Sequence, residues 1–351
     1  MAKSKTSFFK KIIISLIAIL LLSGASIVYY GYRMIYKPNV VIIGKSTTYI
    51  YIKTGSTFED VMHTLYERNF IKNKTSFEWV AERKKYKNKV KPGRYLIKAK
   101  MSNNDLIDLL RSGEQEPVKV VFNTARTKED IVSKVCRVIE ADSTSLIDLL
   151  NDNEYLKKYG FDEQNVLALL IPNTYEFYWN TSAEQFVDRM AKEYKSFWND
   201  ERKNKAKANG LSQSEVAIIA SIVQQESNAK SEKPIIAGVY INRLKKGMKL
   251  QADPTVIYAI GDFSIHRVLF EQLSYDSPYN TYLYAGLPPG PICLPTTSSI
   301  DVVLNYEHHN YIYFCAKEDF SGKHNFAKTL NEHNNNAQKF RAALNRRGIK
   351  K

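Results

Sequence analysis

The carboxyl group of Glu226 stands at a position where burial would favour acid catalysis. It follows the segment Val216–Val223, which is apolar on nearly every side and therefore predicts a buried helix. Ile218, Ile222 and Glu226 recur every four residues, which places the carboxyl group on an apolar face near the end of that helix. Desolvation and the helix dipole both disfavour a negative charge there, so we expect a raised pKa. A carboxylic acid that stays protonated near neutral pH can protonate a glycosidic oxygen. Placement alone is a weak signal, because most acidic residues at helix ends simply enter solvent.

Two groups of polar residues further along the chain are candidates for contact with a substrate. Around Pro254 the sequence predicts an extended turn with short polar side chains that could hold sugar hydroxyls or orient the carboxyl group of Glu226. The aspartate before this proline could instead cap the local backbone. The second group follows about 25 residues later and could line a cleft. The candidates are Gln251, Asp253 and Thr255 in the first group and Tyr279, Asn280 and Tyr282 in the second.

The sequence predicts neither a metal site nor an organic cofactor. His324 and His333 are too far apart for a short helical metal motif, and no third ligand accompanies them. Cys136, Cys293 and Cys315 are widely spaced and form no C-x-x-C pair, which argues against a zinc site or a disulfide framework. The sequence does not decide whether Cys293 and Cys315 form a single disulfide bond.

The excess of basic over acidic residues indicates which classes of binding partner the chain favours. The 51 Lys and Arg residues exceed the 36 Asp and Glu residues and give a formal net charge of +15. Such an excess favours nucleic acid, anionic lipid headgroups or an acidic polymer such as cell wall. No zinc-finger spacing, RNP-like string or isolated basic helix is visible, so we expect no nucleic-acid partner. The alternative interpretation is that the excess positive charge only forms a solvated surface without a specific partner.

The amino terminus predicts a membrane anchor at residues 12–32 behind a cytoplasmic tail at residues 1–11. The uncharged stretch Ile12–Tyr30 has 19 residues, which at about 1.5 Å per residue nearly matches a bilayer core of about 30 Å. Four lysines precede it, and Arg33 and Lys37 follow it, which favours an inside amino terminus and an extracytoplasmic body in a single-pass protein of the cell (inner) membrane. The alternative is a cleavable signal peptide with residues 23–25 as its small-residue site. The apolar run continues past that site, which favours the anchor.

Two further regions complete an α+β fold. Residues 40–117 read as strand, helix, turn, strand and helix, with capping pairs that begin at Thr57 and Ser102. This module is either a spacer or a wall-binding unit. Residues 118–345 are richer in helix, and the polar stretch 199–209 predicts an exposed linker. The aromatic run 171–179 could line a sugar cleft or form a buried loop.

Several motifs in order resemble the YceG-like family of endolytic murein transglycosylases. The resemblance is strong over residues 211–340 and looser over residues 40–210, where Lys91-Pro92-Gly93 and Pro172-x-Thr174-Tyr175 carry it. The strong part rests on residues 220–227 (ASIVQQES), 231–244, 246–258, 277–282 (SPYNTY), 286–292 (GLPPGPI), 324–326 and 332–334.

The resemblance implies an amino-terminal membrane helix, a LysM-like subdomain at residues 40–117 and a catalytic domain at residues 118–345, in which Glu226 is essential. Many relatives carry Glu-x-Glu where this chain has Gln224 at the first position. If the first acid were the essential one, this chain would be inactive. We assign catalysis to Glu226 because a buried helix end is where the acid is needed.

The implied activity is endolytic lytic transglycosylation of peptidoglycan glycan strands. Glu226 would protonate the oxygen between N-acetylmuramic acid and N-acetylglucosamine and then take the proton of the muramoyl 6-hydroxyl, which leaves a 1,6-anhydromuramoyl end without water or cofactor. The family likeness also suggests cutting of nascent strands, at the membrane and beside glycan polymerases.

Two other functions stay open. A hydrolytic muramidase would need a second acid, for which Asp253 and Glu176 are candidates, because glycosidases generally use two carboxylates. A non-catalytic, membrane-tethered peptidoglycan-binding scaffold would need neither.

Overall fold

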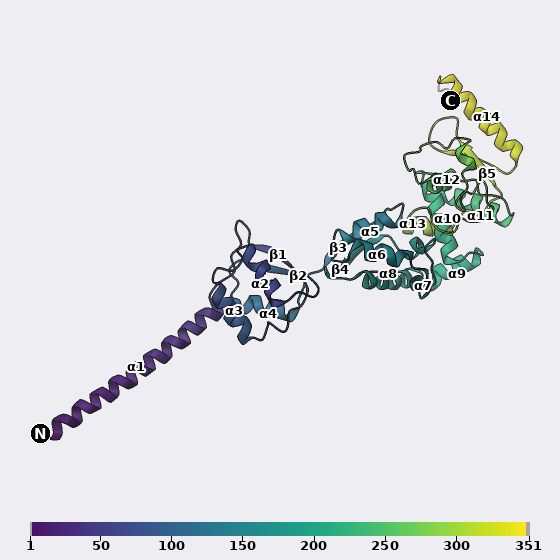
Figure 1. Cartoon of the computed structure of the whole chain (residues 1–351). Coiled ribbons are helices and arrows are strands. Elements are labelled where there is room, and N and C mark those ends of the chain that lie inside the picture. The colour runs from purple at the N-terminus through teal and green to yellow at the C-terminus, as the bar shows by residue number, and fades with distance from the viewer. Residues whose placement is uncertain (1, 349–351) are drawn as a thin grey trace. The chain divides into compact units, whose positions relative to one another are not determined.

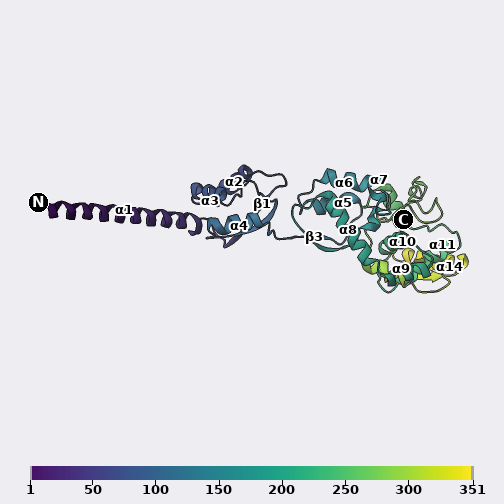
Figure 2. The ribbon, with the colours of Figure 1, turned by 90° about the horizontal axis from the view of Figure 1, so that it is seen from below.

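The computed structural model describes residues 2–348, so Met1 of the expected tail lies outside the described residues. The described chain is a helix-rich α+β protein with one long apolar helix at its amino terminus. It forms two compact units (Figures 1 and 2). The first contains the residues up to Val118 together with Glu176–Asn180, and the second contains Lys119–Tyr175 and the residues from Thr181 on.

Helix α1 (Ala2–Tyr36) is one uninterrupted helix of 35 residues (Figure 1). It contains the whole span expected at residues 12–32 and extends beyond it at both ends. The segment Phe8–Tyr36 is long and apolar enough to cross a membrane, and its apolar side chains are exposed. Exposed Leu20, Leu21 and Leu22, each about 70% accessible, have no protein core to cover them, as expected of a helix that meets lipid.

The first unit pairs a small sheet with three helices. Strands β1 (Thr47–Ile52) and β2 (Gly93–Lys98) are antiparallel, with Ile50 opposite Tyr95. Helices α2 (Phe58–Glu67) and α4 (Asn103–Ser112) begin at the predicted capping residues, and each has a complete capping box. Helix α3 (Lys74–Arg83) was not predicted, because a single capping Asn73 and few apolar residues mark its start.

The aromatic run at residues 171–179 is divided between the two units, because residues up to Tyr175 belong to the second unit and Glu176–Asn180 belong to the first. Strand β4 (Asn173–Phe177) pairs with β3 (Val118–Phe122). Tyr175 and Phe177 are buried in this strand, whereas Tyr178 just after it is exposed, so the centre of the run is a strand rather than the buried loop that was the alternative to a sugar cleft. The helical elements around it are α5 (Lys128–Cys136), α6 (Ser143–Asn151), α7 (Asn153–Lys157), η1 (Val166–Leu169) and α8 (Ala183–Phe197).

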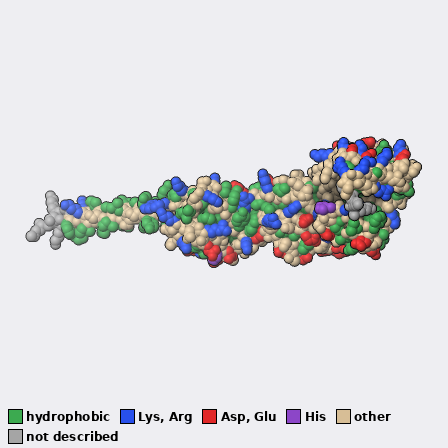
Figure 3. Space-filling view, turned by 90° about the horizontal axis from the view of Figure 1, so that it is seen from above, with side chains coloured by type: hydrophobic (Ala, Val, Ile, Leu, Met, Phe, Trp, Pro, Cys, Tyr) green, Lys and Arg blue, Asp and Glu red, His purple; other side chains and the backbone are tan. Residues whose placement is uncertain are grey.

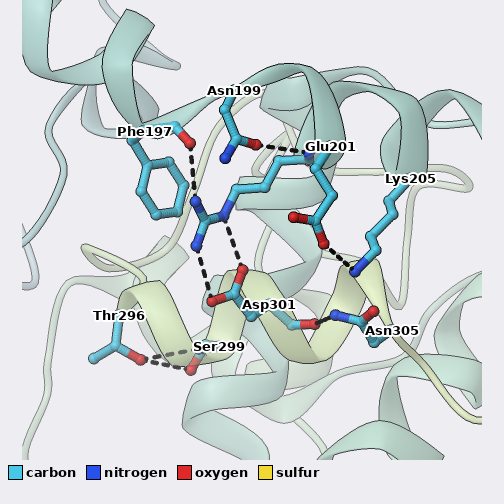
Figure 4. A network of polar contacts seen from close by, with 9 residues as sticks. Phe197, Asn199, Glu201, Lys205, Thr296, Ser299, Asp301 and Asn305 are labelled. Atoms are coloured by element: carbon cyan, nitrogen blue, oxygen red, sulfur yellow. Dashed lines mark hydrogen bonds and ion pairs between the residues drawn. The ribbon is translucent and has the colours of Figure 1, made fainter.

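The stretch expected to be an exposed linker is a helix, so that prediction was wrong. Helix α9 (Asp200–Ala208) begins at the capping residue Asn199, and Ala206 is buried. The Arg202 guanidinium donates two hydrogen bonds, of 2.9 and 3.2 Å, to the Asp301 carboxylate on α13 (Thr297–Leu304), as Figure 4 shows. The sequence did not predict this helix because it has no wide apolar face. An ion pair with a distant residue attaches it to the rest of the unit instead.

Helix α10 (Gln213–Glu226) is the core element of the second unit. It starts at a Ser212–Glu215 capping box and packs against α9, α11 (Lys233–Lys245), α12 (Asp253–Ile260) and α13. All residues from Val216 to Val223 are buried, as predicted. The remaining elements are η2 (Gln272–Ser274), the antiparallel pair β5 (Tyr313–Ala316) and β6 (His324–Ala327), and α14 (Leu330–Arg346).

Candidate active site

Glu226 is the last residue of α10 and lines a cleft of about 220 Å³. Its side chain is partly buried, and its Oε2 atom is fully buried without a hydrogen-bond partner. A buried carboxylate oxygen without a donor is costly, whereas a protonated carboxyl group there can donate to a ligand. The cleft is lined by Glu226, Arg243, Leu250, Gln251, Asp253, Tyr282, Phe314, Cys315, Ala316 and His324.

The groups around Glu226 act on its pKa in opposite directions. Burial and then the negative charge of Asp253 raise the pKa of Glu226 to about 7, against 4.5 for an ordinary glutamate. The Tyr240 hydroxyl and the Arg243 guanidinium act in the opposite direction and stabilise the carboxylate. The raised pKa predicted from the sequence is therefore confirmed. A carboxyl group that titrates near pH 7 can give up a proton and take one back.

Tyr240 and Arg243 come from α11 and were missed as neighbours of the acid. They are spaced by three residues, so they share one face of that helix, and this spacing was the available signal. The Tyr240 hydroxyl is buried, has no hydrogen-bond partner of regular geometry, and has a pKa raised by burial and by Glu226.

The buried Arg243 guanidinium joins the walls of the cleft. It donates to the Ile312 carbonyl at 2.6 Å, just before β5, and to the Leu250 carbonyl at 2.8 Å, just before α12. Burial lowers the pKa of Arg243, and the Tyr313 ring lies 5.3 Å from its guanidinium. Arg243 therefore fixes the cleft and places a positive charge near Glu226.

The segment around Pro254 is the start of a helix rather than an extended turn, so that prediction was wrong. Asp253 is the first residue of α12, and Pro254 occupies the first turn, where the missing amide hydrogen costs nothing. Asp253 does not cap the helix with its side chain; its Oδ1 instead accepts a 2.5 Å hydrogen bond from the Tyr282 hydroxyl. Gln251 is exposed in the cleft wall in the left-handed backbone region, at φ 52°. The structure therefore brings Gln251, Asp253 and Tyr282 together beside Glu226.

Three other candidates are engaged within the protein. Thr255 is fully buried, and its hydroxyl bonds the Ala252 carbonyl and the Thr281 hydroxyl. Asn280 is fully buried and donates its amide to two carbonyls of the preceding loop. Tyr279 is partly buried and donates to the Gln164 carbonyl at 3.2 Å. These residues do not line the cleft and instead hold the segments that do.

Gln224 faces away from the cleft. Its Oε1 accepts hydrogen bonds from the Thr296 amide at 2.7 Å and the Ser299 hydroxyl at 3.0 Å, and its amide donates to the Leu294 carbonyl. It therefore anchors the start of α13. Gln224 lines a different pocket from Glu226, so its side chain takes no part in the cleft.

The far wall of the cleft is made by β5 and β6. His324 is largely buried, and its Nδ1 lies 3.0 Å from the Glu232 carboxylate, which also accepts from the His324 amide. This contact fixes the His324 side chain in the cleft wall. Cys293 and Cys315 are free thiols, so the bridge left open by the sequence is not formed. Within residues 2–348, no group of three metal-binding side chains comes together.

Comparison with known proteins identifies the family. The profile of the YceG-like family matches residues 50–339, which is most of the chain. The chain belongs to the YceG-like family. A crystal structure of a yceG-like protein from Listeria monocytogenes is 29% identical, with a TM-score of 0.53, and covers 83% of this chain and 99% of its own.

Curated relatives in the YceG-like family carry a functional name. A protein of Bacillus subtilis named endolytic murein transglycosylase is 31% identical over 323 residues, which are 86% of this chain and 87% of that protein. Two proteins of the same name from Streptococcus pneumoniae are 26% identical over 94% of this chain, which spans 65% of their length.

Proposed function

We propose that this chain is an endolytic murein transglycosylase that cuts the bond between N-acetylmuramic acid and N-acetylglucosamine in peptidoglycan strands. The observation that carries the proposal is the partly buried Glu226, with a pKa of about 7, at the floor of a polar cleft. Membership of the YceG-like family and the names of the curated relatives support it.

In the first step, protonated Glu226 gives its proton to the glycosidic oxygen. The C1–O bond of the muramoyl sugar breaks, and the N-acetylglucosamine part leaves with the proton as its 4-hydroxyl. Burial of Glu226 keeps the proton available near neutral pH. The carboxylate that remains is stabilised by Tyr240 and Arg243, which both favour the charged form.

In the second step, the Glu226 carboxylate takes the proton of the muramoyl 6-hydroxyl as its oxygen bonds to C1. The product is a 1,6-anhydro ring, and Glu226 regains its starting proton. One carboxyl group suffices because the attacking oxygen belongs to the substrate. The substrate N-acetyl carbonyl would stabilise the cation between the two steps, as in substrate-assisted glycosidases.

The cleft residues divide into two roles. Gln251, Asp253 and Tyr282 line the cleft and would contact sugar hydroxyls. Thr255, Tyr279 and Asn280 would act as positioning residues, because their polar groups bond the protein. The chemistry requires no metal or organic cofactor.

The amino-terminal half would place this chemistry at the membrane. Helix α1 would anchor the chain with residues 1–11 in the cytoplasm and the catalytic domain, residues 118–345, outside. The unit at residues 40–117 would serve as a LysM-like subdomain. An enzyme anchored there would meet nascent strands and the glycan polymerases that make them. Crosslinking to these polymerases tests the contact. If the crosslinks disappear when only α1 is replaced, the catalytic domain has no specific interface with the polymerases.

Hydrolysis by a muramidase is the second candidate function, because Asp253 lies in the same cleft as Glu226. Glu176, the other possible second acid, belongs to the other compact unit and does not line the cleft. A scaffold would need no carboxyl group in the cleft.

Mass spectrometry of glycan products separates these functions. Wild-type protein should leave anhydromuramoyl ends on purified peptidoglycan, and Glu226→Gln should leave none. Reducing ends from the wild type would instead indicate a muramidase. Equal glycan length and cell shape with wild type and Glu226→Gln in vivo would support the scaffold.

A further inference from the structure

A second pocket lies where α1 joins the first unit. It has a volume of about 290 Å³ and is bounded by the end of α1, the segment that follows it and the start of α3. Three cationic side chains line it: Arg33 from α1, Lys37 just after α1, and Lys72 just before α3. The glycan-cutting site makes no use of them.

The charge of this pocket is not balanced by the protein. No acidic residue is among those that line it, and within the described residues no ion pair to Arg33, Lys37 or Lys72 is formed. All three side chains are exposed. Figure 3 shows Lys and Arg side chains gathered at the junction of α1 with the unit that follows it. Three cations without a counter-ion around one pocket favour an anionic ligand.

The floor of the pocket is held by a network of side-chain hydrogen bonds. The Asn39 side chain is buried, donates to Asn103 Oδ1 at 2.7 Å, and accepts from the Asn73 amide at 2.7 Å. The Asn103 amide in turn donates to the Met34 carbonyl of α1 at 2.9 Å. These bonds connect the last turn of α1, through Asn103 at the start of α4, to the start of α3, so the backbone segments that carry the three cations are held around one pocket.

The pocket lies at the height of the lipid headgroups when α1 spans the membrane. The apolar stretch of α1 ends at Tyr30, and Arg33 follows after three residues, about 4.5 Å along the helix. Ile27, Val28 and Tyr30 are all more than 65% exposed, so acyl chains can lie along the helix below the pocket. Arg33 and Lys37 also stand on the side of the anchor that ordinarily carries fewer cations.

We propose that this pocket binds the phosphate of an anionic membrane lipid in the outer leaflet. Arg33, Lys37 and Lys72 would surround the phosphate while the acyl chains follow α1. The inference rests on the membrane anchoring proposed above. Phosphatidylglycerol and a polyprenyl diphosphate share this chemistry, and the two sources can be tested separately.

The test is native mass spectrometry of the full chain in mixed detergent micelles. Separate samples contain phosphatidylcholine with phosphatidylglycerol, phosphatidylcholine with polyprenyl diphosphate, and sodium phosphate alone. The test variant is Arg33→Gln/Lys37→Gln/Lys72→Gln. The matched control is Lys87→Gln/Lys89→Gln/Arg111→Gln, which removes the same charge from the same unit but does not line the pocket.

Wild type and control should retain one of the two anionic lipids over phosphatidylcholine, and the test variant should lose at least about tenfold in retention, since each cation near a membrane surface contributes measurably. The lipid that shows this dependence is the source. Equal retention by all three proteins, or equal loss in test and control variants, would overturn the proposal, as would binding of free phosphate without lipid selectivity.

Flotation of all three proteins with neutral phosphatidylcholine vesicles checks the anchor independently. A wild type that does not float would refute the anchoring itself. Proteins that float without lipid selectivity would refute only the pocket, and neither result bears on glycan cutting.

Discussion

Replacing Glu226 with glutamine should stabilise the protein in alkaline solution. In the folded chain Glu226 has a pKa of about 7, against 4.5 for an ordinary glutamate. Between these values the folded state holds more protons than the unfolded state, so wild-type stability falls as pH rises from about 4.5 to 7. A difference of about 2.5 units corresponds to about 3 kcal/mol. Glutamine keeps the shape without the charge, so the variant should gain up to that amount above pH 8 and almost nothing near pH 4.

Urea denaturation of the full chain in detergent at pH 4, 6 and 8 measures this difference. Trp198 is buried in the core that α10 fills, so its fluorescence reports on the unit that contains Glu226. Replacing Trp79 and Trp179 with phenylalanine in every protein leaves it as the only tryptophan. Glu271→Gln, on an exposed loop, controls for the loss of one negative charge. A stability gain for Glu226→Gln that is the same at all three pH values would refute the argument from burial.

Two further substitutions test the surroundings of the acid, and a third tests the packing of the Gly290 loop against Gln164. Tyr240→Phe removes a hydroxyl that lowers the pKa of Glu226, so the alkaline limb of the activity profile should move up by about half a unit to one unit; an unchanged limb would exclude that contact. Asp253→Asn removes a charge that raises the same pKa, so the limb should move down by a similar amount, and a shift upward would contradict the sign. Gly290→Ala would place a Cβ 1.9 Å from the Gln164 carbonyl oxygen and should cost about 2 kcal/mol or more in urea denaturation, whereas a neutral effect would mean that the loops separate easily.

Local signals in the sequence predicted much of the fold. Thr57 and Ser102 each begin a helix with a complete capping box, because that motif satisfies free backbone amides through residues three apart. The buried run before Glu226 predicted both the helix and the raised pKa, since each depends on local apolar character.

Features that depend on tertiary contacts were not predicted. The polar helix around Arg202 is held by Asp301, which lies 99 residues away. Thr255 was a candidate for contact with the substrate, but it is buried, and its hydroxyl forms a hydrogen bond with the Thr281 hydroxyl. Tyr240 and Glu226 belong to different helices, and only the packing of α11 against α10 brings the Tyr240 hydroxyl to Glu226.

The most direct test of the central claim is glycan cutting in water enriched in ¹⁸O. Intramolecular attack by the muramoyl 6-hydroxyl consumes no water, so every new end should be an anhydromuramoyl end without ¹⁸O. Glu226→Gln should yield no new ends. New reducing ends that carry one ¹⁸O atom each would show that water is the attacking group and would contradict the transglycosylase mechanism.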